Sequence, residues 1–338
     1  MSQGRAAVYE EPLGPAGVRV RERPRTAPVP GAVAVAIKAA SINHLDLWMA
    51  HGAQREVTPP RVIAADGAGV VEASADPAWR AGDEVVIYPV ACCWECEWCR
   101  SGQNVLCKRF GVIGEHTDGT ACELFHIDAR NLFRKPAGLS WSEAAAFPLT
   151  FLTAWRMLTT RARLRAGETV LVVGAGAGVA VAAVTIARHL GARVFVTSRS
   201  EAKRKRAIEL GAEAAFESTD FSKHVRSATG DGVDVVFEHV GPATLAESMR
   251  SVAMGGRVVT CGSTSGVKAE IMMPRLFWGQ MDLLGSTMGN AGEFRAVLQA
   301  MDDGLRPVVD SVYPLGEVQA ALQRLDAAEQ FGKVVLSV

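Results

Sequence analysis

The spacing of apolar and polar residues changes character near residue 140. Before that point, runs of Val, Ile and Ala are separated by Gly, Pro and Asp, a pattern typical of short strands joined by turns. Three such runs are GAVAVAIKAA (31–40), RVIAADGAGVVEA (61–73) and GDEVVIYPV (82–90). The first third of the chain therefore predicts a β-rich domain.

From about Ser140, strands alternate with helices. We expect the Ala-rich segment 140–164 to be largely helical, with Pro148 beginning or bending a helix. Beyond it, periodic helical stretches separate apolar strands at 169–173, 193–197, 234–240, 257–262 and 282–289. Such alternation predicts a parallel, doubly wound sheet. After Gly289, two helical stretches lead to a final strand, KVVLSV, which would return to the first domain.

Local signals mark two helices of this region. The first, 179–190, has an apolar face, and Gly191 suits its C-terminal cap. In the second, Ser198 and Glu201 are three residues apart, which fits a capping box, and Gly211 would end the helix.

The composition is that of a globular protein with room for two domains. The chain has 338 residues, 49% of them hydrophobic, and its 36 Lys and Arg balance 36 Asp and Glu. Zero net charge argues against a nucleic-acid-binding or strongly basic membrane-surface protein. Glycines interrupt the uncharged stretch 170–187, so we expect a strand, turn and helix there rather than a transmembrane helix. The opening MSQGRAAVYEEPLG lacks the apolar core of a secretory signal, and we expect a cytoplasmic protein.

A glycine-rich segment, VLVVGAGAGV, lies between a predicted strand and a predicted helix. Gly174, Gly176 and Gly178 would let the backbone turn tightly and approach a pyrophosphate at the helix N-terminus. This context favours dinucleotide binding over a flexible Gly/Ala turn. Val179, which we include in the cofactor loop, stands where the strict G-x-G-x-x-G pattern has its third glycine.

The residues after the next strand indicate which dinucleotide binds. An NAD site needs an acidic residue at the end of that strand, but Ser198 and Arg199 follow it here. Arg199 and Lys203 lie four apart on one helical face, where, with Ser198, they could hold a 2′-phosphate. We therefore expect NADP(H). The alternative is that 203–206 is a solvated basic face, which is our interpretation of Lys205.

Four cysteines are crowded into one short segment with the spacing C-x2-C-x2-C-x7-C, namely Cys93, Cys96, Cys99 and Cys107. Four thiolates at this spacing can close a tetrahedron around one structural zinc per chain, with no open position for a substrate. The alternatives are an iron–sulfur centre or free thiols, and Cys92 could compete as a ligand. We expect Cys122 and Cys261 to be buried apolar residues.

Together these features resemble the medium-chain dehydrogenase/reductase superfamily, and within it the zinc-binding quinone oxidoreductase-like branch. The resemblance rests on DGAGVVEA, GDEVV, the cysteine segment, PLTFLTAWRML, GAGAGV, EHVG, GGRVVTCG and FGKVVL, and covers nearly the whole chain. It implies an α/β protein with a GroES-like β-rich catalytic domain (1–150, with 288–338 returning to it) and a doubly wound Rossmann NADP(H)-binding domain (151–287). It also implies homodimers or homotetramers, formed through the edge strand near LLGSTMG.

The resemblance includes one departure. Alcohol dehydrogenases of this family hold a catalytic zinc with a Cys, a His-Glu pair and a further Cys or Asp, which fall here on Asn43, Ala65-Asp66 and Leu149. The family's relay hydroxyl falls on Leu45. Asn, Ala and Leu cannot rebuild that site, so we expect the catalytic zinc to be lost. A different metal site is the alternative, drawn from His44, Asp46, Asp66, His51, His116 and His126; more simply, the aspartates bond turn backbone and the histidines supply surface polarity.

Without a Lewis acid, the substrate that is easiest to reduce is one that itself delocalises the developing negative charge. Hydride from NADPH can add to an enone, enal, enoyl thioester or quinone, and the resulting anion needs only hydrogen-bond donors and a proton. Asn43 would orient the nicotinamide or donate to the carbonyl oxygen, unless it is only a turn residue. His44 would donate or face phosphate, and Tyr88 would supply a proton unless it is a packed strand residue. By the resemblance, the cofactor also contacts Thr153, Val240, Gly262, Ser263 and Lys333.

The leading prediction is therefore an NADPH-dependent enone or quinone reductase that acts on small molecules, with no nucleic-acid or membrane partner. Two other functions remain open. A zinc alcohol dehydrogenase or carbonyl reductase with unusual ligands would contain a second zinc and turn over a saturated alcohol. A non-enzymatic NADPH-binding sensor would bind the cofactor without turnover.

Overall fold

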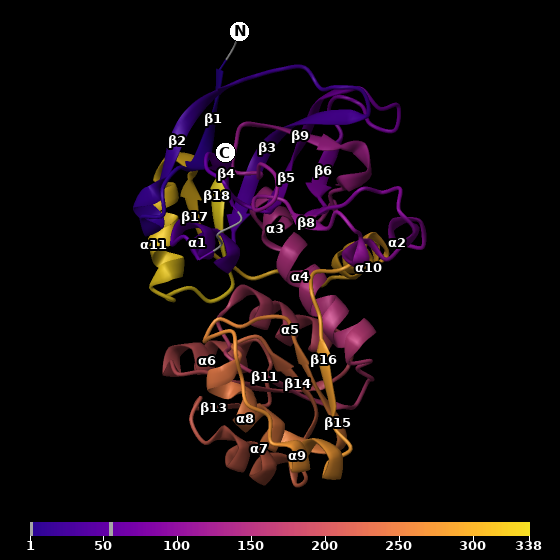
Figure 1. Ribbon diagram of the computed structural model, residues 1–338, viewed down its shortest axis with the longest axis vertical. Helices are drawn as coiled ribbons and strands as arrows, with labels where there is room; N and C mark the ends of the chain where they lie inside the picture. The colour runs from indigo at the N-terminus through magenta and orange to yellow at the C-terminus, as the bar shows by residue number, and fades with distance from the viewer. Residues whose placement is uncertain (1–2, 54–56) are drawn as a thin grey trace. The chain divides into compact units, whose positions relative to one another are not determined.

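The computed structural model describes residues 3–53 and 57–338, and the chain divides into two compact units (Figure 1). The first unit comprises Met1–Leu149 and Asn290–Val338, and the second comprises Thr150–Gly289. The C-terminal segment thus folds with the N-terminal part of the chain.

The first unit is built mainly of antiparallel strands. Its strands are β1 Gln3–Tyr9, β2 Val18–Pro24, β3 Ala32–Ile42, β4 Arg61–Val62, β5 Asp66–Ser74, β6 Glu84–Ile87, β7 Val90–Ala91, β8 Gly111–Val112, β9 Leu124–Asp128, β10 Leu132–Arg134, β17 Val309–Pro314 and β18 Lys333–Ser337. Its helices and 3-10 turns are η1 Gly14–Gly17, α1 His44–Ala50, α2 Glu97–Arg100, η2 Asn104–Leu106, η3 Ala129–Asn131, α3 Trp141–Ala146, α10 Ala291–Asp302, η5 Leu315–Glu317 and α11 Val318–Asp326.

The larger sheet of this unit brings distant parts of the chain together. Its strand order is β10-β6-β5-β3-β18-β17, with β9 pairing β3. The end of β3 lies between two neighbours: Ile42 is opposite Val334 of β18, and Ser41 is opposite Asp66 of β5. The first residues of β18 and β5 therefore meet beside the last residues of β3.

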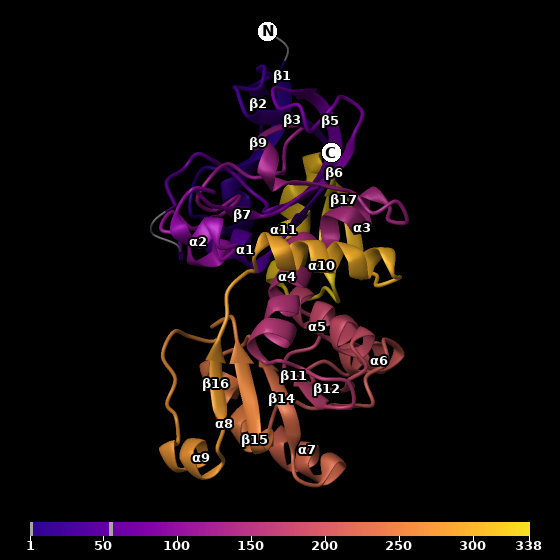
Figure 2. The same cartoon turned by 90° about the vertical axis from the view of Figure 1, so that its right-hand side faces the viewer.

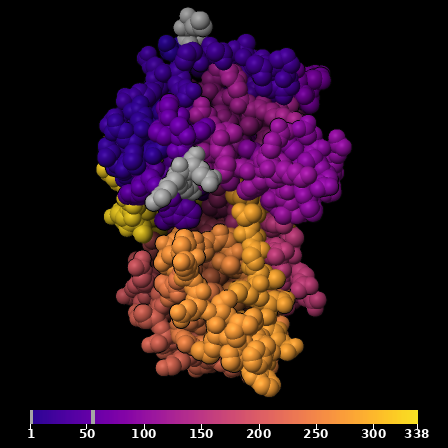
Figure 3. Space-filling view, viewed as in Figure 1, coloured from indigo at the N-terminus to yellow at the C-terminus, as the bar shows by residue number. Residues whose placement is uncertain are grey.

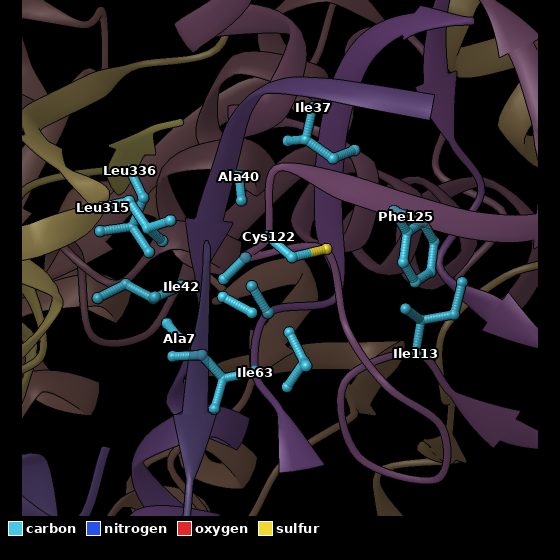
Figure 4. Packing of buried hydrophobic residues seen from close by; sticks show 14 of the residues in the cluster. Ala7, Ile37, Ala40, Ile42, Ile63, Ile113, Cys122, Phe125, Leu315 and Leu336 are labelled. Carbon is cyan, nitrogen blue, oxygen red and sulfur yellow. The ribbon is translucent and has the colours of Figure 1, made fainter. Parts of the chain in front are cut away.

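Apolar side chains from these strands and from α11 form the core of the first unit (Figure 4). Ile37, Ile42 and Phe125 contribute to it, and Cys122 lies among them. Burial raises the pKa of the Cys122 thiol to about 12. The prediction that Cys122 acts as a small buried apolar residue is thus confirmed.

The second unit contains a parallel sheet with the strand order β13-β12-β11-β14-β15-β16 (Figure 2). Its elements, with the helix that leads into it, are α4 Pro148–Trp155, the π-helical turn η4 Arg156–Arg161, β11 Thr169–Val172, α5 Gly178–His189, β12 Arg193–Thr197, α6 Glu201–Glu209, β13 Ala214–Phe216, α7 Phe221–Thr229, β14 Val233–Glu238, α8 Pro242–Ser251, β15 Val252–Thr260, α9 Met273–Trp278 and β16 Asp282–Gly285. Each described neighbouring pair is parallel, so the predicted doubly wound α/β fold is confirmed.

The structure agrees with the sequence predictions for this region, with one exception. Pro148 begins α4, and the uncharged stretch 170–187 forms β11 and most of α5. No helix in the described part of the chain is both long enough and apolar enough to cross a bilayer. The predicted capping box is wrong, because the cap of α6 is Ser200, whose hydroxyl accepts from Lys203 N at 3.4 Å. Ser198 directly follows β12, and its N–H donates to the carbonyl of Phe216 at 3.0 Å.

Candidate active site and metal centre

The carboxyl ends of β11, β12, β14 and β15 carry most of the predicted cofactor residues. In a parallel sheet these ends lie along one edge, which is where nucleotides bind in such folds. After β11, Gly174 and Gly176 adopt φ angles of 77° and 117°, and Gly178 begins α5. The loop is held on β12, because Gly174 N donates to Thr197 Oγ1 at 3.1 Å.

Two glycines of this loop are closely covered by other side chains. A Cβ on Gly174 would lie 3.2 Å from both His239 Nε2 and Val240 Cγ2. A Cβ on Gly176 would lie 2.6 Å from Lys203 Cδ. Larger residues at either position would therefore collide with neighbours. The same contact places the Lys203 side chain directly against the loop, which the sequence suggested only through its basic charge.

The end of β12 carries no carboxylate. Ser198 is buried there, and Arg199, the next residue, is exposed. Lys205 instead forms an exposed ion pair with Glu201 at 2.8 Å, so its interpretation as a solvated residue is confirmed. Ser198, Arg199 and Lys203 thus remain the candidate partners of a 2′-phosphate.

Glu238, which the sequence analysis did not single out, organises the turn after β14. Its buried carboxylate accepts from Val240 N at 2.7 Å, Gly241 N at 3.1 Å, Thr244 Oγ1 at 2.9 Å and Ser248 Oγ at 2.6 Å. These bonds fix the backbone that covers Gly174. The signal available in the sequence was an acidic residue directly after the apolar run DVVF.

The second unit contains three more predicted cofactor residues, namely Gly262, Ser263 and Thr153. Gly262 follows β15, and a Cβ there would come within 2.6 Å of the carbonyl oxygen of His239. Ser263 beside it is exposed. Thr153 is buried on α4, where its hydroxyl donates to Met288 Sδ at 3.8 Å.

The four cysteines predicted as metal ligands come together in the first unit. The Sγ atoms of Cys93, Cys96, Cys99 and Cys107 all lie within 4.8 Å of one another. The Cys93–Cys99 and Cys93–Cys107 separations are 3.8 and 3.4 Å. A tetrahedral zinc with Zn–S bonds of about 2.3 Å places its sulfurs roughly 3.8 Å apart. The cluster therefore fits one ion better than a cluster of several irons.

Backbone N–H groups of Glu95 and Cys96 favour the deprotonated, ligating form of Cys93 and hold its pKa at about 6, whereas burial raises the pKa of the Cys99 thiol. Cys107 Sγ accepts from the N–H groups of Cys93 and Arg109, both at 3.3 Å. Cys92 is not part of the group; its sulfur accepts from Asn104 Nδ2 at 3.7 Å. When bound, zinc would tie the segment around α2 together, with no ligand position left open.

A buried ionic network occupies the junction of β3, β5 and β18. Lys333 and Asp66 form an ion pair at 3.0 Å, with side-chain exposures of 4% and 0%. The Lys333 ammonium also donates to the Ile42 carbonyl at 3.0 Å and to Asn43 Oδ1. Its three donors therefore all have acceptors, and the structure gives Lys333 a set of partners other than the predicted cofactor.

Asn43 and Asp66 are bound to each other within this network. Asn43 Nδ2 donates to Asp66 Oδ2 at 2.9 Å, and Ser41 Oγ donates to the same oxygen at 3.2 Å. Asp66 Oδ1 accepts from Leu149 N at 2.6 Å. Because an ammonium can only donate, the Asn43 carbonyl must face Lys333, and the orientation of the amide is fixed. In the sequence, the signal for the Asp66–Lys333 ion pair was one Asp and one Lys, of opposite charge, in two otherwise apolar strands.

The other predicted catalytic residues have different surroundings. His44 begins α1, with its ring edge-on to Trp48 at 5.6 Å, and desolvation lowers its pKa. Tyr88 is fully buried against Phe133 and Phe294. This packing corresponds to the simpler of its two interpretations.

The alternative metal site is not assembled. Within residues 3–53 and 57–338, the four-cysteine cluster is the only group that could hold an ion. Asp46 instead accepts from the backbone N–H groups of Asn43 at 2.7 Å and Ala64 at 2.8 Å. His51 lies 3.1 Å from Asp326, and the His116 ring accepts from Val112 N at 3.1 Å.

Comparison with known families decides the classification. The model described as "Alcohol dehydrogenase GroES-like domain" matches residues 29–137, and the one described as "Zinc-binding dehydrogenase" matches residues 178–303. The chain belongs to the medium-chain dehydrogenase/reductase superfamily. This medium-chain protein is accordingly an oxidoreductase, as the resemblance implied.

Proteins similar to this chain include enoyl-CoA reductases and an alcohol dehydrogenase. A "Crotonyl-CoA carboxylase/reductase" of Cereibacter sphaeroides is 30% identical over 326 residues, covering 86% of this chain and 76% of that protein. A solved "2-octenoyl-CoA carboxylase reductase CinF in complex with NADP and 2-octenoyl-CoA" superposes with a TM-score of 0.92 at 26% identity, covering 100% and 88% of the two chains. A solved "NAD-dependent alcohol dehydrogenase" superposes with a TM-score of 0.95 at 40% identity, covering 99% of both.

Proposed function

We propose that this medium-chain protein uses NADPH to reduce a carbon–carbon double bond conjugated to a carbonyl, with an enoyl thioester as the favoured substrate class and quinones as a related one. The reaction would need no catalytic metal. The observation that carries this proposal is the Lys333–Asp66–Asn43 network. Two of its residues, Asn43 and Asp66, fall by the resemblance where the family's alcohol dehydrogenases have ligands of the catalytic zinc.

The donor set there does not suit a divalent metal. Asn43 offers only an amide oxygen, and the Lys333 ammonium already binds it. Asp66 is the carboxylate of this network, and it is paired with the Lys333 ammonium at 3.0 Å. A zinc ion would have to displace the ammonium and would meet neither His nor Cys, the ligands it prefers.

The same network can stabilise developing negative charge on a substrate. When bound, NADPH supplies a hydride to the β-carbon, which leaves an enolate that takes a proton at the α-carbon. Asn43 uses one Nδ2 hydrogen on Asp66, and its second has no partner in the described part of the chain. Because Lys333 binds Oδ1 of the same amide, it polarises the group and strengthens that remaining donor. We assign this donor to the enolate oxygen, in the manner of an oxyanion hole.

The preference for NADPH rests on the end of β12. Ser198 and Arg199 stand where an NAD-specific protein carries an acidic residue, and Lys203 reaches the glycine loop beside them. The NADP in the solved 2-octenoyl-CoA enzyme supports this choice.

A second candidate function is favoured by the similarity to an NAD-dependent alcohol dehydrogenase. One assay separates the two. The purified protein is offered NADPH with crotonyl-CoA, and separately NAD⁺ or NADP⁺ with a saturated primary alcohol. We expect oxidation of NADPH and formation of the saturated thioester. Turnover of the alcohol, with none of the enoyl thioester, would support the second candidate and overturn the first.

Replacing Arg199 with alanine should weaken NADPH much more than NADH. The loss of one charge-assisted phosphate contact should raise the KM for NADPH by about tenfold and leave that for NADH within about twofold. Steady-state kinetics with each cofactor checks this. Lys205→Ala, which removes a cation already paired with Glu201, is the control and should change neither value. Equal losses for NADPH and NADH in Arg199→Ala would refute the 2′-phosphate role.

We also propose that the protein forms homodimers or homotetramers through the free edge of its parallel sheet. The strand β16 pairs only with β15 in the described residues. Nearby α9 exposes Phe277 and Trp278, at 52% and 73%, on the part of the chain coloured orange in Figure 3. Apolar exposure beside an open strand edge is typical of protein–protein contacts, and sedimentation velocity would show a lone monomer if this proposal is wrong.

A further inference from the structure

The second unit has a concave surface that lies away from the loop 174–178. A cavity of about 370 Å³ opens among α7, α8 and α9. A neighbouring cavity of about 300 Å³ shares two of its lining residues, Arg226 and Arg275. Neither lining includes a residue of the loop 174–178. In Figure 2, α7 and α9 lie at the lower end of the sheet.

The lining of the larger cavity is predominantly basic. It contains Lys223, Arg226, Arg250 and Arg275, against only Asp220 and Glu247. Glu247 is already engaged, since it accepts from Ser222 N at 3.0 Å and from Arg250 at 2.6 Å. With Asp220 counted, four cations and two carboxylates leave an excess of two positive charges, and the cations not bound to Glu247 are Arg226, Arg275 and Lys223.

Arg226 and Arg275 are held by backbone and not by carboxylates. Arg275 donates to the carbonyls of Met249 at 3.2 Å, Arg250 at 3.0 Å and Val252 at 3.2 Å. Arg226 donates to the same Val252 carbonyl at 3.5 Å. No ion pair of either guanidinium occurs within residues 3–53 and 57–338. The end of α8 thus fixes two arginines side by side without neutralising them.

This arrangement carries an electrostatic cost that an anion would offset. Burial lowers the pKa of Arg275, and the positive charges of Arg226 and Arg250 lower it further. The guanidiniums are therefore close enough to repel one another. A bound polyanion would replace that repulsion by attraction. The Nη1 group of Arg275 and the Nε and Nη2 groups of Arg226 are not used in the bonds to these carbonyls, and such charged donors bind phosphate oxygens strongly.

We propose that this cavity binds the phosphate groups of a soluble phosphorylated small molecule, with Arg226 and Arg275 as the principal donors and Lys223 and Arg250 at the rim. The concave shape favours a compact di- or triphosphate over an extended acidic peptide. The site is separate from the cofactor loop, and the proposal does not depend on the reaction assigned above.

Calorimetric titration of the NADPH-saturated protein with inorganic pyrophosphate tests this inference, because saturation keeps pyrophosphate off the glycine loop. At constant ionic strength we expect a dissociation constant below about 1 mM, with weaker binding of inorganic phosphate. Arg226→Gln should weaken pyrophosphate binding by about tenfold. Arg275→Lys, which keeps a positive charge at the end of α8, should also weaken it, because an ammonium cannot bind these backbone carbonyls and still present a donor at the guanidinium Nη1 position.

Lys268→Gln is the matched control, since it removes an exposed cation of the same unit that lines neither cavity. Its affinity should equal that of the unmodified protein. Three results would overturn the proposal. They are no binding of pyrophosphate, pyrophosphate binding that potassium chloride abolishes, and pyrophosphate binding that neither arginine substitution changes. Arg275→Lys also serves as the second variant if Arg226→Gln fails to fold.

Discussion

Replacing Lys333 with methionine is expected to destabilise the first unit by about 3–5 kcal/mol, because the Asp66 charge would remain buried without its partner. The amide protons of β3 and β18 should then exchange faster in native-state hydrogen exchange. This measurement localises the effect, which a single unfolding midpoint of a two-unit protein cannot do.

Two further variants make this prediction specific. Removing both charges in Lys333→Met with Asp66→Asn should recover about 2 kcal/mol relative to the single Lys333→Met variant, since no uncompensated charge is left. Lys38→Met, on the exposed face of β3, should change stability by less than about 0.5 kcal/mol. A double variant no more stable than Lys333→Met would mean that the two side chains are not energetically coupled.

The second large effect is expected from Cys96→Ser. A serine hydroxyl does not replace a thiolate ligand, so the protein should lose most of its zinc on dialysis against a chelator. Stability should fall by several kcal/mol, because the binding energy of a structural zinc, on the order of 10 kcal/mol, contributes directly to folding.

Zinc analysis and thermal unfolding of the same samples check this prediction. Cys92→Ser is the matched control: this neighbouring cysteine lies outside the ligand group, and its loss should leave zinc content unchanged. Zinc retained in Cys96→Ser, or lost equally in Cys92→Ser, would show that the ligand set is misassigned.

The features that sequence reasoning located well are encoded locally. The glycine turn between β11 and α5 and the cluster of four cysteines each come from one short segment. The βα alternation likewise predicts the parallel sheet, because each strand and helix carries its own periodicity. The misplaced cap of α6 shows the limit of this approach, since Ser198 and Ser200 carry the same local signal. Only the pairing of β12 with β13 decides between them.

The contacts that sequence reasoning missed join segments that are far apart in the chain. Lys333 and Asp66 are 267 positions apart, and Lys333 and Asn43 are 290 apart. They meet only because β18 and β5 flank the end of β3. Glu238 was missed for a different reason: its four partners are close in sequence, but an acidic residue at the end of a strand has no fixed meaning until the following turn is seen.

We propose that this medium-chain protein reduces its substrate without a catalytic metal, and the zinc content of the active protein tests this proposal most directly. We predict about one zinc per chain after extensive dialysis, held by the four cysteines, with undiminished NADPH-dependent reduction of crotonyl-CoA. About two zinc ions per chain, with activity that disappears as the second is removed, would contradict the account and make alcohol chemistry the leading function.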